Sequence, residues 1–262
     1  MRAIVWTVAV AGTLFLSTET LGAEAKEIRR TVDLAADGRL SIDTYKGSID
    51  VSTWDRPSAE IVARVEPDED DDPRDQAEKV RQTEVRIEGS GPAVRIRSDY
   101  ERIRSHSFWL FAGDHGTLPL VRYSIRMPRA ARLEVKDYKS RTTIAGLAAG
   151  LELNTYKGEV EIREMNGPVR LETYKGEVRA AYSRFATSQY ETYKGDVEVS
   201  IPRQTAFSLE TDLGRRGELR SDFATPERSS SRGSRRIDAA VNGGGPALRL
   251  RTYKGEFRIR SR

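Results

Sequence analysis

The chain has 262 residues, of which 37% are hydrophobic and 32% are charged, and it carries a formal net charge of +4. This length can bury a hydrophobic core, and the absence of cysteine excludes disulfides, thiolate nucleophiles and cysteine-based zinc sites. Only two histidines, His106 and His115, could supply histidine chemistry.

Residues 1–25 have the organisation of a secretory signal peptide. Arg2 precedes an apolar run over Ile4–Leu16, and Ala23-Glu24-Ala25 fits the small-residue cleavage pattern. The run is shorter than the ~20 residues that a membrane-spanning helix needs, although an uncleaved membrane anchor is the alternative. We therefore expect an exported protein of the periplasm or the cell surface, with no transmembrane span in the mature chain.

The mature chain, residues 26–262, is expected to form one domain whose first part, residues 26–136, is the less regular. Ile28–Val51 fits a first coil or cap of a β structure, and Ala59–Val65 alternates apolar and polar residues as a strand does. Asp75–Thr83 is the one helix candidate, because a proline precedes it at an early helical position.

Three irregular segments interrupt this part. The acidic run Asp68–Asp72 is more typical of a solvated loop than of a metal site. Gly89–Pro92 separates two alternating segments and predicts a hairpin. The aromatic segment Phe108–Phe111 is expected to cover an open end of the sheet. His106 and His115, which flank it, are expected to be loop histidines and not a general base.

A Tyr-Lys phrase, followed by glycine in all copies but one, recurs through the chain. From Tyr138 the tyrosines are 18, 18 and 19 residues apart. A further 19 residues lead to Asp212 in a degenerate copy, and Tyr253 follows 41 residues later. A period near 20 residues is typical of a solenoid. The copies contain Tyr45, Lys46, Tyr138, Lys139, Tyr156, Lys157, Tyr174, Lys175, Tyr193, Lys194, Tyr253 and Lys254.

Alternation inside each copy predicts strands with one buried face. The glycines after the lysines, such as Gly158, Gly176, Gly195 and Gly255, are expected to supply a positive φ at a corner, and Asn166-Gly167-Pro168 marks a second corner. The expected inward column contains Leu151, Leu153, Val160, Ile162, Val169, Leu171, Val178, Val197 and Val199.

An 18-residue unit is too short for a strand–helix–strand crossover. Separate antiparallel hairpins would also alternate, but they do not require identical corners. We therefore predict an all-β fold, a single-chain β-helix or β-roll solenoid with coils of about 18–19 residues. Residues 137–262 form its regular part, and one short helix belongs to the N-terminal part.

The strand Val121–Arg129 leads into the repeated glycine corners, behind an export signal. This arrangement resembles the bacterial putative-adhesin family of unknown function, whose members carry short repeats of glycine, an acidic residue and Ile or Val. The resemblance extends over roughly residues 28–262. It implies a β-helical or β-roll envelope protein without established catalytic residues. In this chain Tyr-Lys stands where small polar residues are commoner.

Equivalent residues of stacked coils lie ~4.8 Å apart, so the tyrosines would stack and the lysines would form a row. The chain has 35 arginines and 9 lysines, and six of the lysines lie at this corner, which a general preference for positive charge does not explain. In a structural interpretation, Glu159, Glu177, Asp196 and Glu256 offset the lysines, whose stems cover the rings. In a functional interpretation, the column binds an extended anionic partner such as an acidic polysaccharide or lipid headgroups.

Other chemistries are less favoured by the sequence. Lysines beside the acidic column disfavour calcium, and we expect no metal site and no cofactor. The export signal disfavours nucleic acid, despite the basic segment 227–236. We favour a non-catalytic surface-binding protein. The alternatives are a carbohydrate-active β-helix enzyme, which rests on fold analogy alone, and a structural or regulatory module that binds another envelope protein.

Overall fold

The computed structural model describes residues 25–103, 117–224 and 235–262. These residues are nearly all β, so the predicted class is confirmed. The predicted helix is α1 (Pro73–Gln82), with Asp72 as its N-cap, and one further helical turn covers residues 101–103. The expected signal peptide up to residue 24, the aromatic segment Phe108–Phe111 and both histidines lie outside the described residues.

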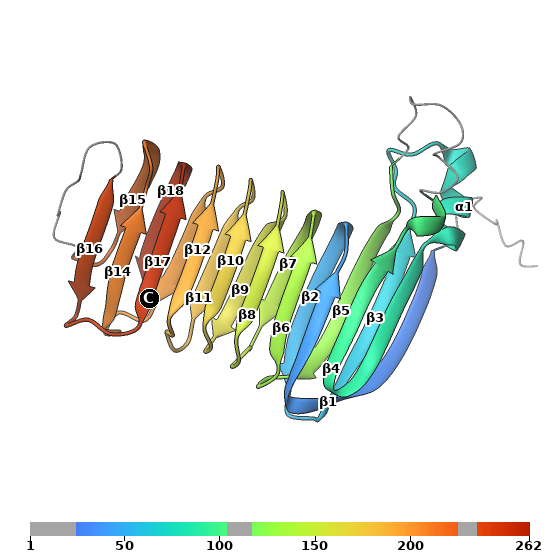
Figure 1. Ribbon diagram of the computed structural model, residues 1–262, viewed down its shortest axis with the longest axis horizontal. Coiled ribbons are helices and arrows are strands. Elements are labelled where there is room, and N and C mark those ends of the chain that lie inside the picture. The colour runs from blue at the N-terminus through green and yellow to red at the C-terminus, as the bar shows by residue number, and fades with distance from the viewer. Residues whose placement is uncertain (1–24, 104–116, 225–234) are drawn as a thin grey trace, which may run out of the picture.

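The repeat part is built from two ladders of parallel strands, and the strands follow one another along the long axis of the molecule (Figure 1). We call them the first and the second ladder. The first ladder contains β6 (Arg132–Asp137), β8 (Leu151–Thr155), β10 (Val169–Thr173), β12 (Ser188–Thr192) and β17 (Ala247–Thr252). The second contains β7 (Lys139–Ala145), β9 (Glu159–Met165), β11 (Val178–Tyr182), β13 (Val197–Ile201) and β18 (Lys254–Ser261).

Each strand of the repeat pairs with the equivalent strand of another copy and not with its neighbour in the chain. Thr155 lies opposite Thr173, and Thr173 lies opposite Thr192, so like residues are placed beside like. This parallel pairing excludes separate antiparallel hairpins in the repeat. The two ladders belong to one connected, open sheet of eighteen strands.

The hydrophobic core runs without a break through the repeat. Every residue of the predicted inward column is at most 3% exposed: Leu151, Leu153, Val160, Ile162, Val169, Leu171, Val178, Val197 and Val199. Full burial of such a side chain contributes ~1.5–3 kcal/mol to stability. Because the packing of these side chains fixes the register of both ladders, the core also sets the positions of the corners.

The N-terminal strands do not follow their order in the chain. β1 (Lys26–Asp43) pairs in parallel with both β4 (Glu84–Asp99) and β6, and β2 (Lys46–Trp54) pairs with both β5 (Leu120–Pro128) and β7. β3 (Ser58–Glu66) pairs in antiparallel fashion with β1 and β5. The first Tyr-Lys-Gly corner, between β1 and β2, is therefore internal.

The C-terminal strands are internal in the same way. β17 pairs with β12 on one side and with β14 (Phe207–Asp212) on the other, while β18 pairs with β13 and β15 (Arg216–Ser221). β16 (Arg236–Val241) adds to β14 in antiparallel fashion. Lys26–Asp33 of β1 pairs with β3, and β18 is held by both β13 and β15, so both ends of the described chain are tied into the sheet.

The segment Gly89–Pro92, predicted as a hairpin turn, lies inside the single strand β4, but the chain turns sharply there. Gly89 and Gly91 have φ of +86° and +68°, and a Cβ atom on Gly89 would lie 2.3 Å from the carbonyl oxygen of Ala93. β1 shifts its register against β4 between Leu34 and Arg39, opposite this turn.

Candidate binding surface

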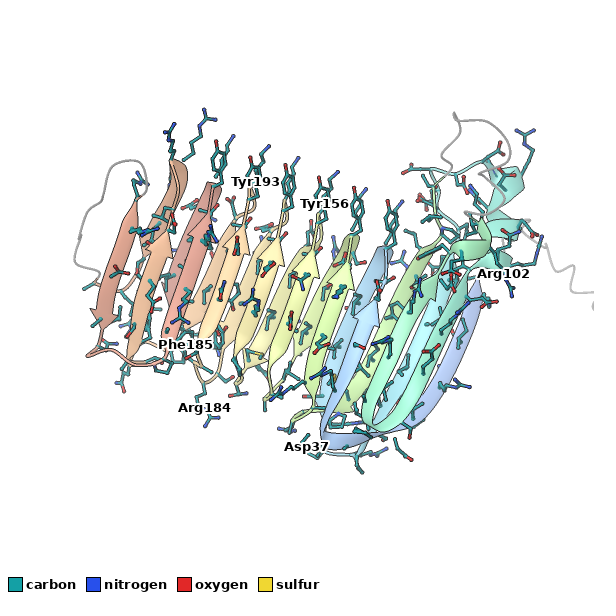
Figure 2. The ribbon with its side chains drawn as sticks, viewed as in Figure 1. Asp37, Arg102, Tyr156, Arg184, Phe185 and Tyr193 are labelled. Carbon is teal, nitrogen blue, oxygen red and sulfur yellow. The ribbon has the colours of Figure 1, made fainter. Side chains whose placement is uncertain are left out.

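Six tyrosines form one continuous stack along the corners of the coils. Neighbouring ring centroids are 4.7–5.0 Å apart and the planes differ by at most 12°. Figure 2 shows Tyr156 and Tyr193 projecting from the same edge of the molecule. The predicted stacking is confirmed, and the rings follow one another in the order Tyr45, Tyr138, Tyr156, Tyr174, Tyr193 and Tyr253. Each such pair contributes ~0.5–1.5 kcal/mol beyond its burial.

Backbone hydrogen bonds hold each corner on the next. The N–H of Lys157 donates to the carbonyl of Tyr138 at 2.9 Å, and the same bond recurs one coil further between Lys175 and Tyr156. In two of the corners the buried threonine accepts a hydrogen bond from the glycine N–H, at 3.0 Å for Thr155 and 2.7 Å for Thr192. The spacing of the side chains is therefore set by the main chain.

The predicted positive φ is present at one of the four corner glycines for which it was expected. Gly255 has it, as does Gly47 of the first corner, but Gly158, Gly176 and Gly195 do not. A Cβ atom on these three would lie 2.0–2.4 Å from a carbonyl oxygen of the adjacent copy. The copies approach so closely there that only glycine fits.

The degenerate copy occupies a different place from the one that the 19-residue period predicts. Tyr193 stacks directly on Tyr253, and Asp212 lies opposite Arg251 beyond it. In the outermost coil Arg216 lies opposite Lys254. The row of cationic side chains therefore continues from the lysines to an arginine at this end.

The stack exposes ring edges and hydroxyls, because the ring faces cover one another. Tyr138, Tyr156 and Tyr174 are each 36% exposed, and Tyr253 is 48% exposed. At the opposite end Tyr45 is half-buried and meets the edge of Tyr100, with centroids 6.5 Å apart. Within the described ranges, the hydroxyls of the five exposed tyrosines have no protein hydrogen-bond partner.

Five lysines of the row have no ion-pair partner in the part of the chain that the structure describes: Lys139, Lys157, Lys175, Lys194 and Lys254. Three of the four acidic residues expected to offset them pair with arginines instead, and the fourth, Asp196, accepts a hydrogen bond from the Glu256 N–H. Glu159 is 3.2 Å from Arg141, and Glu256 is 2.7 Å from Arg220. The row is therefore positively charged along its length. We call these five lysines and Tyr138, Tyr156, Tyr174, Tyr193 and Tyr253 the Tyr-Lys strip.

Two lysines of the strip lie close to the stack. The Nζ atom of Lys157 is 5.3 Å from the ring centroid of Tyr156, and that of Lys194 is 5.5 Å from the centroid of Tyr193. Neighbouring tyrosines cover both faces of these rings, so the lysine stems do not cover the faces as predicted. The two ammonium groups therefore lie beside the stack and not over a ring face.

Lys46, the sixth lysine of the repeat, has a different environment. It pairs with Asp68, and the two side chains are only 17% and 7% exposed. Burial alone would raise the pKa of Asp68, but the hydrogen bond from Lys46 holds it below its usual value. Lys79 similarly pairs with the buried Asp71 at 2.7 Å and ties this segment to α1. The prediction of a solvated acidic loop over Asp68–Asp72 is therefore wrong for these two carboxylates.

A groove of about 700 Å³ follows the other side of the tyrosine stack, over the first ladder. Asn154, Glu172 and Glu191 line it together with the rings. Glu172 lies 2.8 Å from Arg170, and Glu191 lies 3.6 Å from Arg251. Lys136 and Arg251 also line it, so the stack separates a cationic row from a groove of mixed charge.

Asp137 is a residue of the corner that sequence reasoning missed. It replaces the threonine of the other copies and accepts a hydrogen bond from the Ser140 N–H at 2.7 Å. Burial raises the pKa of Asp137 to about 6, although the Ser140 N–H opposes the shift. The signal was present in the sequence, since this copy alone begins with Asp and ends with Ser.

Two other features bear on function. In the described ranges no group of three or more acidic or histidine side chains is placed to hold a metal ion. The helices of the same residues are all too short or too polar to cross a membrane.

Comparison with solved structures finds chains of similar extent and low identity. A putative cell adhesion protein from Clostridium sporogenes is 12% identical, with a TM-score of 0.49 over 91% of this chain and 100% of its own. A putative lipid binding protein from Parabacteroides distasonis is 8% identical, with a TM-score of 0.28 over 88% and 96%. A putative adhesin from the same organism is 12% identical, with a TM-score of 0.26 over 91% and 98%.

No protein-family model matches the sequence, and no curated protein is similar to it. Likenesses at this level carry no argument about activity. The function is therefore argued from the geometry of the Tyr-Lys strip itself.

Proposed function

We propose that this chain is an exported, non-catalytic binding protein of the bacterial cell envelope or surface, adhesin-like in role, and that the Tyr-Lys strip contacts an anionic partner. The observation that carries the proposal is the row of five exposed ammonium groups without acidic partners, held at the spacing of the coils. The partner is an acidic polysaccharide or the headgroups of lipids.

The scaffold of this function is a β-solenoid of a single domain, residues 26–262. Its support is the parallel register of both ladders, in which each copy contributes one strand to each ladder. A solenoid repeats one contact along its axis, so it suits partners that are themselves extended.

The energetics of the row favour a ligand. Unit charges 4 Å apart repel by ~1 kcal/mol in water, and no acidic side chain of the described residues offsets this along the strip. A structural role alone would be served by the tyrosines and by neutral residues beside them. An anionic partner would relieve the repulsion of all five lysines at once.

The enzyme alternative has less support. The groove carboxylates Glu172 and Glu191 each have an arginine partner. Asp137 is the carboxyl group with a raised pKa at the stack, and it serves as the hydrogen-bond acceptor of its own corner. Each of these carboxyl groups therefore already has a partner within the repeat.

The proposal is tested with a variant that carries Lys157→Ala, Lys175→Ala and Lys194→Ala. We expect it to remain folded by circular dichroism and to lose salt-sensitive binding to an acidic polysaccharide or to vesicles of anionic phospholipid. Lys136→Ala is the matched control, since Lys136 is exposed on the groove side of the stack. Unchanged binding by the triple variant would remove the strip as the contact surface.

A further inference from the structure

The ring faces of the tyrosine stack are not available to a ligand. Each of the four inner rings of the strip has a tyrosine on both sides, at 4.7–5.0 Å between centroids. A sugar or an acyl chain cannot lie on a face that is already covered. A ligand along the strip therefore meets ring edges, hydroxyls and ammonium groups, which select for charge and for hydrogen-bonding groups.

The chain itself supplies a carboxylate to one lysine of the row. Lys46 lies in register with Lys139 of the strip, and it pairs with Asp68. At this position the structure therefore shows a carboxylate bound to one ammonium group of the row. The same contact is open at the next five lysines, because no acidic side chain of the described residues reaches them.

The two ends of the row differ. At Tyr45 the stack meets the edge of Tyr100, and the carboxylate of Asp68 pairs with the ammonium group of Lys46, the last lysine of the row. At Tyr253 the row continues to the exposed Arg216. An anionic chain could therefore extend past the Arg216 end, whereas it would meet the carboxylate of Asp68 at the other.

The groove on the far side of the stack restricts where an anionic chain can lie. The groove is lined by Lys136 and Arg251 as well as by Glu172 and Glu191, and both glutamates pair with arginines, so it offers an anionic chain no continuous cationic row. The attractive path is therefore one residue wide and straight, with the lysines on one side and the tyrosine hydroxyls beside them. A linear polymer matches this path. A bilayer presents a flat surface, and the tyrosine rings cannot insert into it because their faces are covered.

From these contacts we infer that the ligand is a linear polysaccharide with carboxylate groups, lying lengthwise along the Tyr-Lys strip, with its carboxylates on the lysines and Asp68 at the closed end of the site. The inference rests on the proposed function and names its ligand class. The tyrosine hydroxyls bind the hydroxyl groups of the sugar. A charged polymer without hydroxyl groups could not make these contacts.

Binding of oligogalacturonates of increasing length tests the inference on the purified protein. We expect the affinity to rise with length until the oligomer spans the five lysines, and then to level off. The fully methyl-esterified oligomer, which has the same backbone without charge, should bind at least about tenfold more weakly. This arm needs no variant, so it stands even where a substitution disturbs folding.

Two sets of substitutions locate the contact. Lys157→Gln, Lys175→Gln and Lys194→Gln together should weaken binding by about tenfold or more, while Lys136→Gln should change it by less than about twofold. Tyr156→Phe, Tyr174→Phe and Tyr193→Phe together keep the stack and remove three hydroxyls. This variant should bind a few-fold more weakly, and unchanged binding would show that the hydroxyls do not select a sugar.

Vesicles of phosphatidylglycerol separate this inference from the proposed function. If the vesicles bind through the lysines and oligogalacturonate does not, the ligand assignment is wrong and the strip remains a binding surface. Equal binding of the methyl-esterified oligomer also overturns the assignment. If neither probe binds in a salt-sensitive way, both the assignment and the proposed function fail.

Discussion

Lys46 and Lys157 occupy equivalent corners of the repeat, yet the environments of their ammonium groups differ. Both follow a stacked tyrosine and precede a glycine. Lys46 is buried against Asp68, whereas Lys157 is exposed without an acidic partner in the described chain. The corner sets where the ammonium group is placed. The segment that packs over it, which belongs to the irregular N-terminal part, decides whether the group stabilises the fold or faces a ligand.

The largest expected effect concerns the close packing of the glycine in this type of corner. Gly176→Ala places a Cβ 2.1 Å from the Gly158 carbonyl oxygen, so the coils must separate. We expect a loss of about 3 kcal/mol or more in the free energy of unfolding, measured by urea denaturation. Gly150→Ala is the control, because its Cβ would meet Pro168 at an ordinary 3.7 Å. Equal stability of the two variants would contradict the close approach.

A smaller effect should separate Lys46 from the rest of the row. Lys46→Met leaves Asp68 buried and unpaired, and should lower the free energy of unfolding by about 2–3 kcal/mol at neutral pH. Lys175→Met removes an exposed charge from a repulsive row and should change it by less than about 0.5 kcal/mol.

The effect of Lys46→Met should also depend on pH. The pair lowers the pKa of Asp68, so its contribution is present above the ordinary carboxyl pKa of 3.8 and is lost as the pH falls below it. The difference between the wild type and Lys46→Met, followed by denaturation at several pH values, should therefore shrink in acid. A constant difference would show that the two residues act through packing alone.

The smallest effect concerns Asp137, the one aspartate at the threonine position of the corners. Because its folded pKa of about 6 lies above the ordinary 3.8, the native state binds more protons between these values, and stability falls as the pH rises through them. Asp137→Thr restores the residue of the other copies. It should raise the free energy of unfolding by about 1–2 kcal/mol at pH 7 and have little effect near pH 4. The same gain at both pH values would argue against ionisation as the cause.

Much of the repeat could be predicted from local pattern. The alternation around Leu171 and Val178 defines a buried face, and the recurrence of Tyr156 at Tyr174 predicts that like residues stack. The pairing of the strand Glu84–Asp99 could not be predicted in this way. Its glycines indicate a turn, but nothing local indicates that the residues after the turn pair in parallel with β1.

The candidate site shows the same division. Its residues were evident because six of nine lysines share one position. The pair of Arg141 with Glu159 joins residues one period apart that lie in register, whereas the pair of Lys46 with Asp68 joins a corner to a segment outside the repeat. The local pattern carries no information about the second kind of pair until the fold brings the groups together.

The sequence by itself determined the period, the buried face and the corner, since each depends on residues within one copy and on backbone geometry that repeats. The tertiary structure alone decided the order of the copies, with Tyr253 against Tyr193 and Arg216 beyond Lys254. Strand pairing depends on which edge is open when a strand docks, and equivalent coils offer nearly equivalent edges. The burial of Lys46 was decided in the same way, by a segment that folds back over the end of the row.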